Sequence, residues 1–159
     1  MDALAEQKTA ISDPLSAMLG YELRRTSVAV MTALADQLAP LGLNPGEASL
    51  LLVIGVNTGV TQSDLARAMR AQPANLQPLV HKLWQSGALE RAPGKGRAIV
   101  LSLSAEGRAL HENVSRVFTR HEARITRSVS AEKRAEMIAL LREICHDACC
   151  ADEGEAITP

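Results

Sequence analysis

The sequence predicts a mainly α-helical fold with one small β-hairpin. Only three of its 159 residues are aromatic, so Leu, Val, Ile, Met and Ala must form the core, and that mixture favours helices over sheets. Asn, Asp, Ser or Thr repeatedly precedes an apolar run with helical spacing, as expected at helix starts. Between residues 88 and 103 the spacing changes to strand-like alternation on both sides of a Pro-Gly-Lys-Gly turn.

The elements follow in the order helices, hairpin, helices. Three or four helices are expected before the hairpin and two after it, and strands are expected over residues 88–92 and 97–103. Residues 1–12 are unpatterned and are expected to be a lead-in. Pro78 lies inside the fourth helix, where we expect a bend but no break. The predicted helix-capping residues are Asp13, Asn44, Thr61, Gln72, Ser104 and Ser130.

Positive charge is concentrated in the middle of the chain. Residues 61–108 hold seven Lys and Arg against three Asp and Glu, whereas both flanking segments are acidic and the whole chain has a net charge of −1. Only the face that contacts phosphates must be positive, so the overall charge does not argue against nucleic-acid binding.

Two short helices joined at Arg70-Ala71 and followed by a hairpin form a winged helix-turn-helix. In that arrangement the second helix enters the major groove and the hairpin reaches the backbone or minor groove nearby. Asn75 and Gln77 suit adenine, Lys82 suits a phosphate or guanine, and cations at the hairpin suit phosphates. The candidate contacts with double-stranded DNA are Ser63, Arg67, Arg70, Gln72, Ala74, Asn75, Gln77, His81, Lys82, Arg91, Lys95 and Arg97.

Within this region the succession TQSDLARAM, ANLQPLVHKLWQSGALER and GRAIVLSLSAEG resembles the MarR family of transcriptional regulators. Two positions depart from the family pattern: Lys95 stands where the family usually has Asp, and Trp84 stands where it usually has a charged residue. We expect Trp84 to be half-buried against the hairpin.

The resemblance implies one domain over residues 1–159, acting as a homodimeric repressor of a palindromic operator. Residues 1–42 and 104–150 would supply dimerisation helices, residues 43–103 the DNA-binding lobe and residues 151–159 a flexible tail. It also implies release by a small aromatic or phenolic ligand, for which Tyr21, Arg24 and Arg25 are the candidate contacts.

Two alternative functions remain open from the sequence. Cys145, His146, Cys149 and Cys150 crowd the C-terminal end, and thiols one helical turn apart suit a metal- or thiol-responsive switch as well as simple packing. The other alternative is a winged-helix interaction module that does not bind DNA.

Several classes are not expected. The chain carries no catalytic motif and no apolar run long enough for a membrane span, and its odd, clustered cysteines do not form a disulfide framework. We therefore expect a cytoplasmic protein that is not an enzyme and needs no cofactor.

Overall fold

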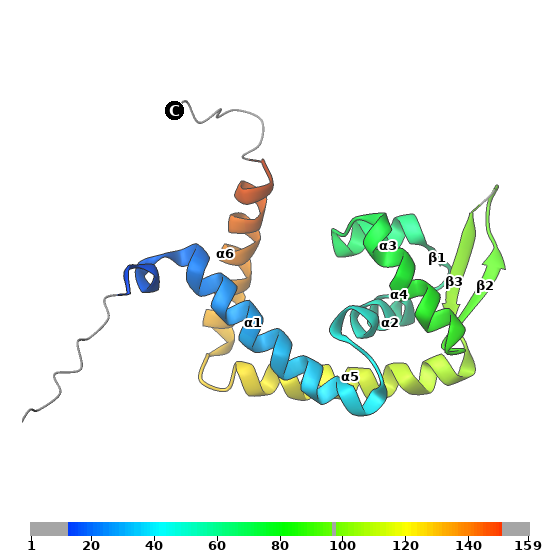
Figure 1. Ribbon diagram of the computed structural model, residues 1–159, viewed down its shortest axis with the longest axis horizontal. Coiled ribbons are helices and arrows are strands. Elements are labelled where there is room, and N and C mark those ends of the chain that lie inside the picture. Colours follow the sequence, from blue (N-terminus) through cyan, green and yellow to red (C-terminus); the bar gives the residue numbers. More distant parts are fainter. Residues whose placement is uncertain (1–12, 97, 151–159) are drawn as a thin grey trace, which may run out of the picture. The chain divides into compact units, whose positions relative to one another are not determined.

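The computed structural model describes residues 13–96 and 98–150, without the side chain of Cys150. The predicted lead-in, the Arg97 contact and the C-terminal tail lie outside these residues. The chain divides into two compact units, residues 1–111 and 112–159. Its elements (Figure 1) are η1 Pro14–Ala17, α1 Leu19–Leu38, η2 Ala39–Leu41, α2 Pro45–Val56, β1 Val60–Thr61, α3 Gln62–Met69, α4 Pro73–Gln85, β2 Leu89–Pro93, β3 Ile99–Leu103, α5 Ala105–Ile125 and α6 Ala131–Cys150.

Four predicted helix caps are confirmed by side-chain hydrogen bonds. The side-chain oxygens of Asn44, Thr61, Ser104 and Ser130 each accept a bond from the backbone N–H three residues later, at donor–acceptor distances of 2.9, 3.2, 2.9 and 3.3 Å. Each bond satisfies a backbone donor that the first helical turn leaves unpaired. These caps set where α2, α3, α5 and α6 begin.

The start of the first long helix differs from the prediction. Asp13 caps only the short η1, where its carboxylate accepts a bond from the Leu15 N–H at 3.0 Å. Met18 then adopts an extended conformation, and α1 begins at Leu19. The interruption follows from Met18, whose extended backbone cannot continue the helix.

The hairpin is confirmed, with a third strand that the sequence did not predict. Strands β2 and β3 pair antiparallel, with Leu89 opposite Leu103 and Pro93 opposite Ile99. The two-residue β1 pairs with the other edge of β3, giving the sheet order β1-β3-β2. This extra strand ties the start of α3 to the hairpin.

The core of the first unit lies beneath α4. Leu76, Val80 and Leu83 of α4 are each at most 2% exposed, and they pack with the apolar residues of the neighbouring elements. Helix α4 contacts α2, α3 and β2. The other fully buried leucines of this unit are Leu38, Leu50, Leu51, Leu65 and Leu101.

The second unit combines a largely buried face with an exposed apolar one. Val114, Val117 and His121 of α5 are buried, and their spacing places them on one face of the helix. On α6, by contrast, the apolar side chains are largely exposed, among them Met137, Leu140 and Leu141. In the described part of the chain, no single helix meets the length and apolarity of a membrane span, although the bent pair Leu19–Leu41 and Pro45–Val56 does so together.

Candidate nucleic-acid interface

Helix α4 has one buried and one exposed face. Opposite its buried leucines and valine, the side chains of Ala74, Asn75, Gln77 and His81 are all exposed. Gln72 precedes the helix and makes no side-chain capping bond, so its amide is also available. These are five of the residues predicted to meet DNA, and all five are exposed to solvent on α4 or directly before it.

The helix continues through Pro78. Proline has no N–H, so the carbonyl of Ala74 lacks the bond it would otherwise accept from residue 78. Both residues are exposed, which lets water satisfy this carbonyl. The prediction that the helix persists across Pro78 is confirmed.

Helix α3 begins with a capping box and ends in a tight turn. The Asp64 carboxylate accepts bonds from the hydroxyl and the backbone N–H of Thr61 at 2.7 and 3.0 Å. These bonds, with a smaller contribution from the Arg67 guanidinium, lower the pKa of Asp64. At the other end Arg70 has φ 48°, a left-handed conformation that closes the turn into α4. Ser63, Arg67 and Arg70 are exposed.

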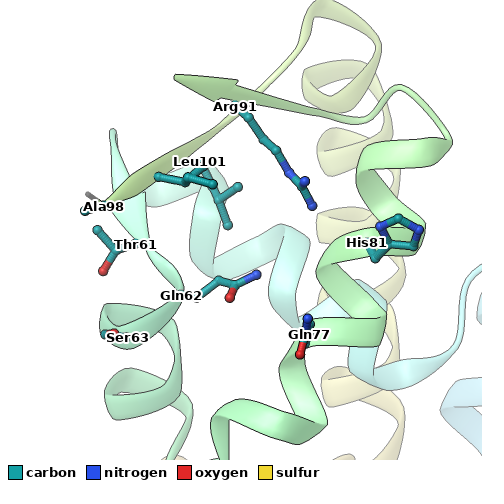
Figure 2. A pocket seen from close by; sticks show the side chains of 9 residues that line it. Thr61, Gln62, Ser63, Gln77, His81, Arg91, Ala98 and Leu101 are labelled. Atoms are coloured by element: carbon teal, nitrogen blue, oxygen red, sulfur yellow. The ribbon is translucent and has the colours of Figure 1, made fainter. Parts of the chain in front are cut away.

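A groove of about 750 Å³ lies between the start of α3, helix α4 and the hairpin. Figure 2 shows Gln62, Gln77 and His81 on the helices and Arg91 reaching from β2 toward α4. Ser63 completes the polar part of the wall. The fold therefore gathers Ser63, Gln77, His81 and Arg91 from three separate elements around one opening, together with Gln62, which was not predicted.

Trp84 joins the end of α4 to the hairpin. Its ring centroid lies 4.2 Å from the guanidinium carbon of Arg91 and 5.9 Å from the centroid of the His81 ring. The side chain is 42% exposed, so the prediction that Trp84 is half-buried against the hairpin is confirmed.

Lys82 has a partner that the sequence did not predict. Its Nζ lies 2.8 Å from Oε1 and 3.0 Å from Oε2 of Glu47, a residue of α2 that is only 2% exposed. The same carboxylate accepts a bond from the Asn44 N–H at 3.0 Å. The ammonium is therefore engaged in holding α4 against α2, although the side chain remains 58% exposed.

The remaining predicted contacts are dispersed. Lys95 lies in the exposed hairpin turn. On α1, Arg25 pairs with Glu22 at 3.1 Å and its guanidinium lies 5.8 Å from the Tyr21 ring centroid. Arg24 and Arg25 line a shallow hollow of about 450 Å³ on that helix.

The C-terminal thiols are not assembled into a metal site within the part of the chain that the structure describes. Cys145 and Cys149 are exposed on α6. Among residues 13–96 and 98–150, no three His, Cys, Asp or Glu side chains are grouped to hold a metal ion.

A capped helix, a tight turn, a second helix with an exposed polar face and an adjoining hairpin define a winged helix-turn-helix DNA-binding protein. The chain is 29% identical over 133 residues to the HTH-type transcriptional repressor Rv2887 of Mycobacterium tuberculosis, covering 82% of this chain and 96% of that protein. A comparison with protein-family models found no match.

Solved structures agree with this similarity. The transcriptional repressor CouR bound to a 23-mer DNA duplex has a TM-score of 0.75 and 28% identity, over 82% of this chain and 94% of that one. CouR bound to p-coumaroyl-CoA has a TM-score of 0.75 and 27% identity, over 86% and 97%. The MarR family protein Rv2887 in complex with salicylic acid has a TM-score of 0.62 and 28% identity, over 80% and 96%. In sequence and fold the chain is similar to these MarR-family repressors, and it is a DNA-binding transcriptional repressor of that type, not an enzyme.

Proposed function

We propose that this repressor works in the cytoplasm as a two-fold homodimer on a roughly palindromic operator, from which a small aromatic or phenolic ligand releases it. The observation that carries the proposal is the exposed polar face of α4 beside the groove. A helix of this kind fits the major groove of B-DNA, where base edges are distinguishable.

Side-chain chemistry divides the proposed contacts into two classes. Asn75 and Gln77 offer paired donor and acceptor groups for base edges, with Gln72, Ala74 and His81 beside them on α4 or at its start. Lys82 is left out of the contact set because its ammonium is engaged by Glu47. The residues proposed to contact the sugar–phosphate backbone are Ser63, Arg67, Arg70, Arg91, Lys95 and, from the sequence alone, Arg97.

The exposed apolar side chains outside the DNA-binding lobe support a homodimer. On α6, Met137, Ile138, Leu140 and Leu141 are 44–51% exposed, and in the first unit Leu19 and Val28 of α1 are about 60% exposed. Exposed apolar faces of this extent mark interaction surfaces in soluble proteins. A two-fold dimer would place the two copies of α4 about 34–36 Å apart, or a multiple of that distance.

The ligand proposal rests on the relatives and on α1. Salicylic acid and the p-coumaroyl group, bound by Rv2887 and CouR, share a phenol ring. We propose Tyr21 for ring contact and Arg24 or Arg25 for the anionic group of such a ligand, since Arg24 and Arg25 are exposed. The ligand would act by favouring a separation of the two α4 helices that no longer matches the grooves.

One experiment tests the main parts of the proposal. Duplexes selected from a random pool are titrated with the protein by fluorescence anisotropy, and the mass of the complex is measured by light scattering. We expect two chains per duplex, and a loss of base preference but not of salt dependence in Asn75→Ala and Gln77→Ala. Salicylate or p-coumaroyl-CoA should release the duplex from the wild type and less readily from Arg24→Ala. One chain per duplex, or identical behaviour of Asn75→Ala and Arg67→Ala, would contradict the proposal.

A further inference from the structure

Arg91 occupies a position in β2 where an apolar residue is expected. Side chains alternate between the two faces of a strand, so Arg91 shares its face with Leu89, which is 3% exposed. Its cross-strand partner is Leu101, which is 1% exposed. The strand therefore directs Arg91 toward the helices at the point where the core ends and the groove begins.

The charged end of Arg91 is held by an aromatic ring. The guanidinium carbon lies 4.2 Å from the centroid of the Trp84 ring, well within cation–π range. In the part of the chain that the structure describes, no carboxylate forms an ion pair with Arg91. The indole thus fixes the direction of this side chain without neutralising its charge.

We propose that Trp84 is a positioning residue that holds the Arg91 guanidinium at the groove for a DNA phosphate. This inference rests on the proposed function, because it assigns Arg91 a phosphate contact. A free arginine loses considerable rotamer freedom when it binds, and a ring contact formed beforehand reduces that loss. Contact with an aromatic face also leaves the N–H groups at the edge of the guanidinium available to phosphate oxygens.

The contact between Trp84 and Arg91 also connects the hairpin to α4. Trp84 lies in the last turn of α4 and Arg91 in the middle of β2, with the Ser86-Gly87 turn between them. His81, one turn before Trp84, lines the groove together with Arg91. The proposed phosphate contact of the hairpin is therefore held at a fixed position relative to the residues of α4 that are proposed to contact bases.

The test is a double-mutant cycle in DNA binding. Trp84→Leu, Arg91→Ala and the double variant are titrated against one duplex over a range of salt concentrations. Arg91→Ala should flatten the plot of log affinity against log salt by about 0.9. Trp84→Leu should weaken binding about two- to fivefold, and it should have no further effect in the Arg91→Ala background. Trp84→Phe keeps an aromatic face and should retain most of the wild-type affinity.

Arg67 of α3 provides a matched control, because it is an exposed arginine that pairs with Asp64 and not with Trp84. The effects of Arg67→Ala and Trp84→Leu should multiply. Trp84 is also the single tryptophan of the chain, so its fluorescence reports the contact without DNA. Arg91→Ala should shift the emission of the free protein, whereas Arg67→Ala should leave it unchanged.

The outcomes separate this inference from the proposed function. If the wild type binds DNA with the expected salt dependence but the effects of Trp84→Leu and Arg91→Ala multiply, the positioning role is wrong and the DNA-binding assignment stands. The positioning role is equally wrong if Trp84→Phe binds as weakly as Trp84→Leu. If the wild type shows no salt-dependent binding to any duplex, the proposed function fails and the inference fails with it.

Discussion

Replacing Lys82 by Met distinguishes a structural lysine from a DNA-contacting one. The substitution keeps the apolar stem and removes the ammonium, which leaves the Glu47 carboxylate, at 2% exposure, bonded to the Asn44 N–H but without its cation. Breaking a buried ion pair costs about 3–5 kcal/mol. Because Lys82 is 58% exposed, water screens part of the interaction, and we expect a loss of about 2 kcal/mol in the free energy of unfolding.

Urea unfolding measures the loss in the free energy of unfolding, and a salt titration of DNA binding shows whether Lys82 contacts a DNA phosphate. Lys82→Met should lower the unfolding midpoint and leave the salt slope unchanged. Glu47→Gln in the same background should cost less than it does alone, since the pair is already broken. Lys95→Met is the matched control and should do the reverse, flattening the slope by about 0.9 with little effect on stability. A flattened slope with unchanged stability in Lys82→Met would show that the lysine contacts a phosphate and does not hold α4 against α2.

Three further predictions concern the DNA-binding lobe and the start of α5, which meets it at Ala88. Pro78→Ala should raise the free energy of unfolding by up to about 3 kcal/mol, measured in urea, because it restores a helical bond to Ala74. Gly107→Ala should lower the free energy of unfolding by about 1–3 kcal/mol or more, since a Cβ there would lie 1.9 Å from the Ala88 carbonyl oxygen. Gly20→Ala is the control: a Cβ at that position meets no atom within 4 Å, so the substitution should not destabilise the protein. The pKa of Asp64 is lowered in the folded protein, so the ionised carboxylate stabilises the fold. This stabilisation is fully present above pH 3.8, the ordinary pKa, and is lost as the pH falls through the lowered pKa of the folded state. Melting temperatures of wild type and Asp64→Asn should therefore differ at neutral pH and converge in acid.

The features that the sequence predicted are those set by neighbouring residues. The caps at Asn44, Thr61, Ser104 and Ser130 are confirmed because capping needs only a side chain and a backbone N–H three residues apart. The exposed face of α4 is likewise a consequence of helical spacing. Capping residues and helical spacing were therefore sufficient to predict α4 and the turn before it.

The features that the sequence did not predict depend on residues distant in the chain. The pairing of Lys82 with Glu47 spans 35 positions, and no local pattern indicates it. Strand β1 has only two residues, and its pairing with Leu101 and Val100 of β3 is decided by tertiary packing. The contact of Trp84 with the hairpin was predicted, but its partner Arg91 was not. Which hairpin residue faces Trp84 depends on the register of β2 against β3, which the sequence alone does not give.

The proposed function requires two copies of α4 to enter one duplex in successive grooves, and hydroxyl-radical footprinting of a selected duplex tests this at single-nucleotide detail. We predict two symmetric protected regions whose centres are separated by whole helical turns of about 10 base pairs. In Arg91→Ala, the weaker protection should be confined to backbone positions beside those regions. A single protected region, or a symmetric footprint that Asn75→Ala and Arg91→Ala leave unchanged in position and strength, would contradict the proposed function.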